Sequence, residues 1–203
     1  MNNTPHTNCL TLRLLHTAKG YKAVTFDIFD TLLKRDCARP ADLFALMEVT
    51  HQAALGFAEA RVAAEAETRQ TLGREVTLAE IYAHPALRGT DPTAECAAEL
   101  AMIAPNRPVA QAAAACHARG QKVYAVSDMY LPKEQIEAML QKCGLDFLDG
   151  VFVSCEYRVQ KRSGKLFKLF LQQTALRPAE VLFVGDSPRA DFAGAALAGI
   201  RCF

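Results

Sequence analysis

The sequence predicts an α/β protein built on a parallel β-sheet, with a helical domain inserted after the first strand. Short apolar runs rich in Val and Phe alternate with segments of helical period along the chain. Such runs are typical of parallel strands that are covered on both faces and joined by helical crossovers. The stretch between Thr31 and Val123 is far longer than the dozen or so residues that a crossover needs, which predicts the insertion.

Five apolar runs are predicted to be the strands of this sheet. They lie at residues 23–26, 123–126, 151–153, 181–184 and 200–203. The helix after the second run has the clearest signals, because Pro132 is suited to its start and Gly144 to its end. Between them, Ile136, Met139, Leu140 and Cys143 follow the i, i+3, i+4, i+7 spacing of a buried helix face.

The insertion is expected to be all-helical and to cover residues 36–106, which leaves residues 20–35 and 107–203 for the core. Leu43, Leu46, Met47 and Thr50 form one helical stripe, and residues 57–70 form a second helix. Thr77 and Glu80 have the spacing of a capping box, whereas residues 84–93 indicate a loop. A domain inserted at this point lies over the carboxyl ends of the strands, where open α/β sheets bind ligands.

Within the second inserted helix, four residues recur every fourth position: Phe57, Arg61, Glu65 and Arg69. We expect them to form an exposed ladder of i, i+4 charge pairs. The alternative is a face of the insertion that presents arginine to an anionic substrate.

Composition excludes several classes of protein. The chain has 203 residues, with 23 Lys and Arg against 22 Asp and Glu, so bulk charge does not favour nucleic acid as a partner. No apolar stretch approaches the roughly 18–20 residues that span a bilayer, and residues 1–6 do not resemble a signal peptide. The seven cysteines form no C-x-x-C pair and the five histidines have no ligand spacing, so we expect reduced thiols and a cytoplasmic location.

Polar residues follow each of the four long strands. They are Asp27 to Thr31 after the first, Ser127 and Asp128 after the second, the basic loop 161–165 after the third, and Gly185 to Asp191 after the fourth. Carboxylates brought together at neighbouring strand ends repel one another, and Mg²⁺ with its preference for oxygen ligands relieves that repulsion. A hydroxyl and an ammonium group beside such an ion form a pocket for a phosphoryl group, and an aspartate there is suited to nucleophilic attack.

This arrangement resembles the haloacid dehalogenase (HAD) superfamily of Rossmann-like hydrolases with inserted caps, over nearly all of the chain. The family's D-x-x-x-T motif matches residues 27–31, and its serine or threonine on the second strand matches Ser127. Lys161 stands six residues before Phe167, as in the family's K-P-x-P-x-x-F pattern, although Arg162 and Gly164 replace the prolines. The acidic G-D-x-x-x-x-D motif matches residues 185–191. The D-I-F-D-T-L-L and S-D-M-Y-L segments look like a branch of HAD hydrolases found with glycosyltransferases of surface-polysaccharide synthesis.

The resemblance implies a role for each matched residue. Asp27 would be the nucleophile and, with the backbone carbonyl of Phe29 and the carboxylate of Asp186, a ligand of Mg²⁺. Asp191 would hold a water of the metal or orient the lysine. Phosphoryl oxygens would be bound at Ser127 and Asp128 and by Lys161, with Lys165 as the rival lysine, and Thr31 would position the nucleophile's loop.

The sequence departs from the family's phosphatases at one position. These carry a second aspartate two residues after the nucleophile, which acts as general acid and base, but this chain has Phe29 there and Asp30 next. General acid–base catalysis contributes roughly 10²–10⁴ in rate, so we expect slower hydrolysis unless another group replaces it. Asp30 could do so only if a turn undoes the alternation of side chains along a strand.

The function expected from the sequence is therefore a Mg²⁺-dependent phosphohydrolase acting on a small phosphorylated metabolite, with a sugar phosphate suggested by the resemblance. Two alternatives stay open. A 2-haloacid dehalogenase also lacks the second aspartate, but such relatives work without metal and lack the acidic pair on the fourth strand. A binding or regulatory domain with weakened catalysis is the other, with a glycosyltransferase as its partner. The sequence does not define the oligomeric state.

Overall fold

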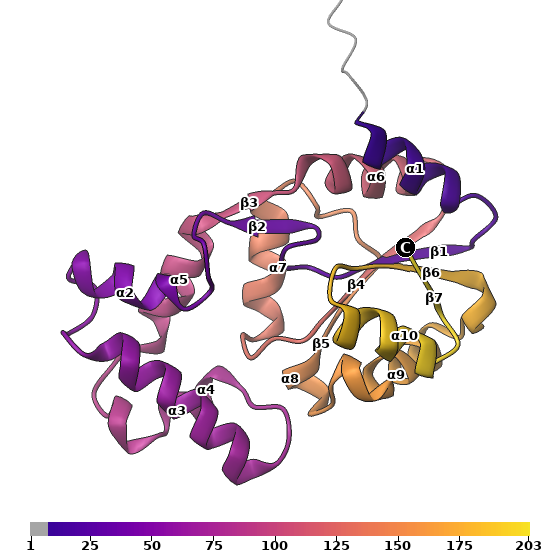
Figure 1. The fold of residues 1–203 in the computed structure, drawn as a ribbon. Coiled ribbons are helices and arrows are strands. Elements are labelled where there is room, and N and C mark those ends of the chain that lie inside the picture. The colour runs from indigo at the N-terminus through magenta and orange to yellow at the C-terminus, as the bar shows by residue number, and fades with distance from the viewer. Residues whose placement is uncertain (1–7) are drawn as a thin grey trace, which may run out of the picture.

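A computed structural model describes residues 8–203; the polar stretch at residues 1–6 lies outside them. Its centre is a five-stranded, wholly parallel sheet with the strand order β5-β4-β1-β6-β7 (Figure 1). The strands are β1 Ala23–Phe26, β4 Lys122–Ser127, β5 Gly150–Val153, β6 Val181–Val184 and β7 Arg201–Cys202. The predicted α/β fold with a Rossmann-like sheet is confirmed, since all five apolar runs form strands.

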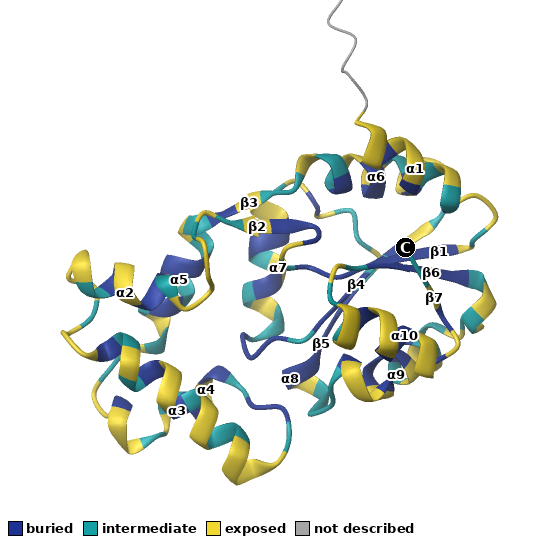
Figure 2. Ribbon diagram, viewed as in Figure 1, coloured by how far each residue is buried: buried dark blue, intermediate teal, exposed yellow. Residues whose placement is uncertain are grey.

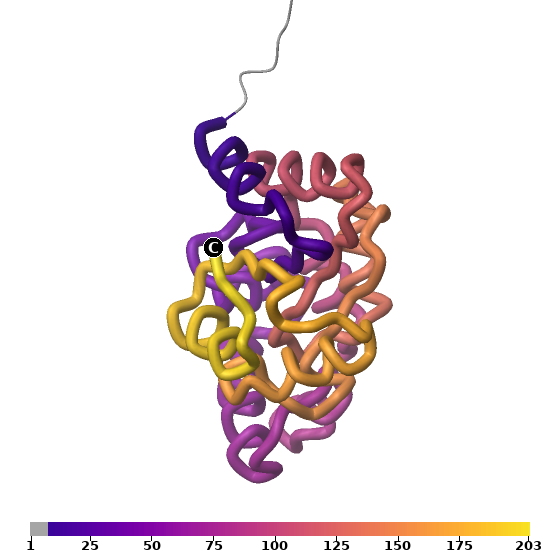
Figure 3. Tube along the Cα trace, turned by 90° about the vertical axis from the view of Figure 1, so that its right-hand side faces the viewer, coloured from indigo at the N-terminus to yellow at the C-terminus, as the bar shows by residue number. Residues whose placement is uncertain are grey.

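Helices cover both faces of the sheet (Figures 1 and 3). One face carries α1 Cys9–Thr17, α6 Arg107–Ala118 and α7 Lys133–Lys142, and the other carries α9 Lys165–Thr174 and α10 Gly194–Leu197. Alternate residues of a strand feed the two cores: Leu182 packs in the first and Phe183 in the second. Both faces are therefore apolar, which explains why β1 and β6 are buried at every position (Figure 2).

Strand register aligns the carboxyl ends of the three central strands. Phe26 at the end of β1 is paired with Ala125 of β4 on one side and with Val184 of β6 on the other. The chain winds from β1 through β4 to β5 and then returns to β6 on the opposite side of β1, so the winding direction reverses between β1 and β6. Ligands of open α/β sheets bind at such a reversal.

The cap consists of four helices and a short 3₁₀ turn: α2 Asp42–Val49, α3 Phe57–Leu72, α4 Leu78–Tyr82, η1 Pro85–Leu87 and α5 Pro92–Met102. Thr77 and Glu80 form the predicted capping box at the start of α4. The all-helical expectation was wrong at the edges of the insertion, where β2 Leu33–Arg35 and β3 Ile103–Pro105 pair as an antiparallel ribbon. Three-residue strands are too short for their periodicity to be read from sequence. Among the described residues no helix is long and apolar enough to cross a membrane.

The expected i, i+4 charge pairs form on α3, but the expected exposure was wrong, since Phe57 and Arg61 are buried and Glu65 and Arg69 are half-buried. Arg61 is fully buried and its guanidinium is bound by Glu95 of α5 through Nε–Oε2 and Nη2–Oε1 distances of 2.7 and 2.9 Å. Glu65 accepts from its remaining nitrogen at 3.1 Å, and the rings of Phe44 and Tyr130 flank the guanidinium. Arg61 therefore joins α3 to α5 inside the cap rather than facing solvent or substrate.

Candidate active site

Asp27 lies directly after β1, at the carboxyl edge of the sheet. Its N–H donates to the carbonyl of Val184 at 2.8 Å, which extends the pairing of β1 with β6 by one residue and fixes the position of the side chain. The side chain is buried with 10% exposure. Burial raises the pKa of Asp27 to about 6, because it outweighs the opposing effect of the ammonium group of Lys161.

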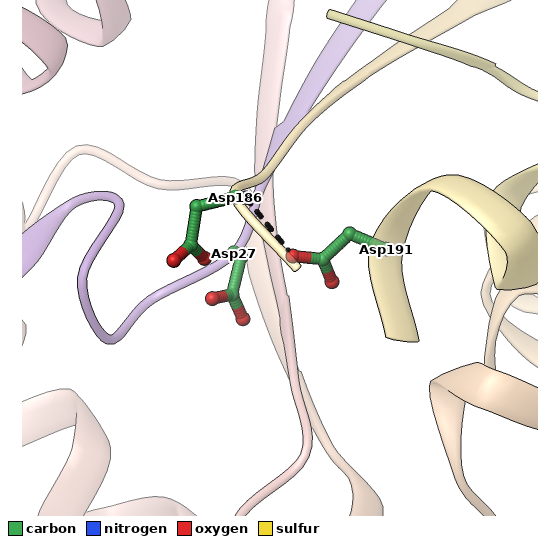
Figure 4. Close-up of side chains that lie close together, drawn as sticks. All are labelled: Asp27, Asp186 and Asp191. Carbon is green, nitrogen blue, oxygen red and sulfur yellow. Dashed lines mark hydrogen bonds between the residues drawn. The ribbon is translucent and has the colours of Figure 1, made fainter. Parts of the chain in front are cut away.

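Three carboxylates converge at this edge, as Figure 4 shows. Asp27, Asp186 and Asp191 each offer an oxygen within 4.8 Å of the others. Asp27 and Asp191 are buried, whereas Asp186 is exposed at the mouth of the group. Asp30 is not part of the group. Such crowding is unfavourable without cations, and oxygen donors at this spacing suit a hard divalent ion.

Lys161 supplies the ammonium group closest to this cluster. It lies in the turn η2 Lys161–Ser163, its side chain is 4% exposed, and its Nζ lies 2.6 Å from both Asp27 Oδ1 and Asp191 Oδ1. Burial by itself lowers the pKa of Lys161, but the charges of Asp27, Asp191 and Asp128 outweigh it and raise that pKa above its ordinary value. Lys165 is exposed at the start of α9, so of the two rival lysines only Lys161 reaches the carboxylates.

Asp191 shapes the site by binding the protein itself. It lies in η4 Pro188–Ala193, and its Oδ2 accepts the N–H of Asp186 at 3.1 Å (Figure 4). The same oxygen accepts the N–H of Ser187 at 3.0 Å. Its Oδ1 faces Lys161. Asp191 therefore holds both the backbone that carries Asp186 and the lysine.

Two glycines permit the close packing around these groups. A Cβ at Gly185 would stand 2.5 Å from Asp191 Oδ2, and a Cβ at Gly194 would collide with the backbone carbonyl of Lys161. Glycine at position 185 thus allows the close approach of Asp191, and glycine at position 194 allows α10 to approach Lys161. From the sequence, Gly185 was noted only as part of a motif.

Three more predicted residues surround the carboxylates. Thr31 is buried and its hydroxyl donates to Asp186 Oδ1 at 3.4 Å. Ser127 ends β4 and is buried beside the end of β1. Asp128 follows it, half-buried, and its Oδ1 accepts the N–H of Lys161 at 2.9 Å. Through this hydrogen bond Asp128 supports the turn η2, called the lysine turn below, and the phosphoryl-binding role expected for Asp128 stays a prediction.

The position two residues after Asp27 carries no titratable group. The ring of Phe29 lies 3.9 Å under the guanidinium of Arg35, at the base of the ribbon that leads into the cap. Asp30 adopts a left-handed conformation with φ 61° and is exposed. It lines a cavity of about 200 Å³ with Thr31 and Asp186, on the side of the sheet where α1 packs.

Sequence reasoning missed the contacts that join the cap to the core beside Lys161. Glu75, in the loop between α3 and α4, is buried and accepts from Gln160 Nε2 at 2.6 Å and from Ser154 Oγ at 3.0 Å. A second contact runs from the N–H of Leu78 to the carbonyl of Tyr130 at 2.8 Å. The partners lie far apart along the chain, and no local pattern signals them.

A parallel sheet with an acidic cluster, a buried lysine at its carboxyl edge and a helical cap inserted after the first strand defines the class of capped Rossmann-like hydrolases. The model of the haloacid dehalogenase-like hydrolases matches residues 21–199, and the chain belongs to this family of enzymes. No curated protein matches the sequence.

Several solved structures share the fold. The L-2-haloacid dehalogenase of Xanthobacter autotrophicus with chloropropionic acid covalently bound has 23% identity and a TM-score of 0.59, over 90% of this chain and 76% of that one. A HAD phosphatase of Thermococcus onnurineus has 21% identity and a TM-score of 0.62, over 89% and 84%. YfnB of Bacillus subtilis, bound to magnesium, has 18% identity and a TM-score of 0.61, over 90% and 87%. At these identities the likeness shows the fold alone.

Proposed function

We propose that the protein is a Mg²⁺-dependent phosphohydrolase that forms a phosphoryl ester on Asp27 and acts on a small phosphorylated metabolite. The observation that carries this proposal is the convergence of three carboxylates within 4.8 Å around a single buried lysine. One ammonium group offsets only one of three negative charges. The remaining charge favours a doubly charged ion at the open side of the cluster, where Asp186 is exposed.

The donor set fits Mg²⁺. Asp27 and Asp186 would hold the ion, together with the backbone carbonyl of Phe29 that the family resemblance implies. Asp191 already contacts Lys161 and the backbone N–H groups of Asp186 and Ser187, so we assign it to holding a water of the metal or orienting the lysine. When bound, the ion would supply positive charge to the phosphoryl oxygens and to the attacking carboxylate.

The chain's own residues divide the remaining work. Lys161 holds one oxygen of Asp27 and neutralises charge beside it, so the other oxygen is left for attack on phosphorus. Ser127 stands at the end of the neighbouring strand, where its hydroxyl can bind a phosphoryl oxygen. Thr31 holds Asp186.

The test is a panel of phosphorylated sugars, nucleotides and aryl phosphates, assayed with Mg²⁺ and with chelator. We expect turnover that requires Mg²⁺ and is abolished in Asp27→Asn, whose amide is isosteric but cannot attack. Full activity in that variant would show that Asp27 is not the nucleophile.

Two other outcomes would favour the alternatives. Halide release from 2-haloacids that is insensitive to chelator would indicate a dehalogenase. Binding of Mg²⁺ and inorganic phosphate without turnover of any ester would indicate a binding domain.

A further inference from the structure

None of the residues assigned to the proposed reaction donates a proton to the leaving group. Hydrolysis of an alkyl phosphate expels an alkoxide unless an acid protonates it, and the same group must later remove a proton from water. Phe29 occupies the position from which the family's phosphatases do this, and its ring is packed under Arg35. If the protein is a phosphohydrolase as proposed, another side chain near Asp27 must transfer these protons.

Asp128 has the position and the attachment for this task. It follows Ser127 at the carboxyl end of β4, the strand next to β1, and is half-buried rather than solvated. The N–H of Lys161 fixes its Oδ1 at 2.9 Å, and the ammonium of the same lysine contacts Asp27 at 2.6 Å. Lys161 thus binds both carboxyl groups, that of Asp128 through its backbone N–H and that of Asp27 through its ammonium group. Its Oδ2 has no hydrogen-bond partner among residues 8–203, so that oxygen is available for a proton.

The charged groups around Asp128 come from three elements. Lys161 faces it from η2, Asp191 from η4, and Glu75 from the cap loop between α3 and α4. Burial raises the pKa of Asp128 to about 6, against the effect of Lys161 and with the help of the two carboxylates. A carboxyl group in this range holds and releases a proton near neutral pH, as an acid–base catalyst must.

We propose that Asp128 is the general acid and base of this enzyme, in the role that Phe29 cannot fill. In the first step Asp27 attacks phosphorus and the bond from phosphorus to the leaving oxygen breaks. The proton of the Asp128 carboxyl passes to that oxygen, and a neutral alcohol departs. In the second step water attacks the phosphoryl group on Asp27, and the ionised Asp128 takes the water's proton. The phosphorus–Asp27 bond then breaks, which releases inorganic phosphate and restores both carboxyl groups.

The experiment compares leaving groups in the variant Asp128→Asn, assayed in the full chain with Mg²⁺. Asparagine keeps an oxygen that can accept the N–H of Lys161 but cannot donate a proton as an acid. We expect kcat/KM for an alkyl phosphate to fall by about 10²–10⁴, the usual contribution of general acid catalysis. For p-nitrophenyl phosphate, whose leaving group needs no proton, we expect kcat/KM to change less than tenfold. Asp128→Glu should recover part of the loss on the alkyl ester.

A pH profile separates proton transfer from support of the lysine turn. In the wild type, kcat/KM for the alkyl phosphate should fall on the alkaline side, where the acid is ionised, and Asp128→Asn should lack this limb. The matched control is Asp146→Asn, an exposed aspartate after α7, which should behave as wild type on both esters. Equal loss on both esters, or no loss on either, would overturn the role of Asp128. Failure of the phosphohydrolase proposal itself would instead appear as wild-type protein without Mg²⁺-dependent turnover.

Discussion

Replacing Lys161 with methionine tests whether its ammonium group is the main counter-charge of the acidic cluster. The substitution keeps a long side chain but removes the ammonium group that lies 2.6 Å from both Asp27 and Asp191. Both carboxylates are buried, so in metal-free protein water does not replace the ammonium group that the substitution removes. Removing one partner of a buried ion pair costs roughly 3–5 kcal/mol, and Lys161 serves two such pairs. We therefore expect the free energy of unfolding to fall by about 3–5 kcal/mol at pH 8.

The assay is urea unfolding of wild type and Lys161→Met with chelator, at pH 8 and at pH 5. The loss should be smaller at pH 5, because a protonated carboxyl no longer repels its neighbour. Lys165→Met is the control: it removes an exposed lysine from the same segment and should change stability by less than about 0.5 kcal/mol. If the two variants lose equal stability at pH 8, Lys161 does not compensate the buried carboxylates and the electrostatic description of the site is wrong.

Three further predictions address the cap, the nucleophile and the packing of the lysine turn. Arg61→Met should lower the free energy of unfolding by roughly 3–5 kcal/mol, because it removes the partner of the buried Glu95. The control Arg39→Met, which replaces an exposed arginine, should lower it by less than about 0.5 kcal/mol. Equally small losses for both variants in urea unfolding would show that the Arg61–Glu95 pair does not stabilise the cap. The pKa of Asp27 rises from 3.8 to about 6 on folding, so without metal its contribution to stability is present below pH 4 and is lost as the pH rises through 6. In urea unfolding with chelator, the free energy of unfolding of the wild type should fall by on the order of 3 kcal/mol over this pH range relative to that of Asp27→Asn. Parallel plots of the free energy of unfolding against pH for the two proteins would refute the raised pKa. Gly194→Ala should destabilise by about 1–3 kcal/mol and reduce turnover, because the new Cβ collides with the carbonyl of Lys161; unchanged melting and activity would exclude that contact.

Much of the core was predictable because its signals are local. A strand buried on both faces is almost wholly apolar, as in β6 and in β1, where Thr25 is the one polar residue. The carboxyl ends of parallel strands meet at one edge, so the convergence of Asp27 with Asp186 was expected from their places directly after two predicted strands.

The parts that could not be predicted depend on contacts between distant residues. Periodicity places Arg61 on a face of α3, but its burial depends on Glu95, which arrives from α5. Likewise, Lys161 and Lys165 are equivalent basic residues in sequence, and only the turn η2 directs the first to the carboxylates. The attachment of Glu75 to Gln160 has no local signal either, since the cap and the lysine turn meet only in the folded chain.

The central claim is that the carboxylates of Asp27 and Asp186 form a site for a divalent cation, and calorimetric titration of metal-free protein with Mg²⁺ tests it most directly. The account predicts one bound Mg²⁺ per chain in the wild type, and loss of this binding in Asp186→Asn, which keeps the size of the side chain but removes its charge. Wild-type protein that binds no Mg²⁺, or a variant that binds it as tightly as wild type, would contradict the account.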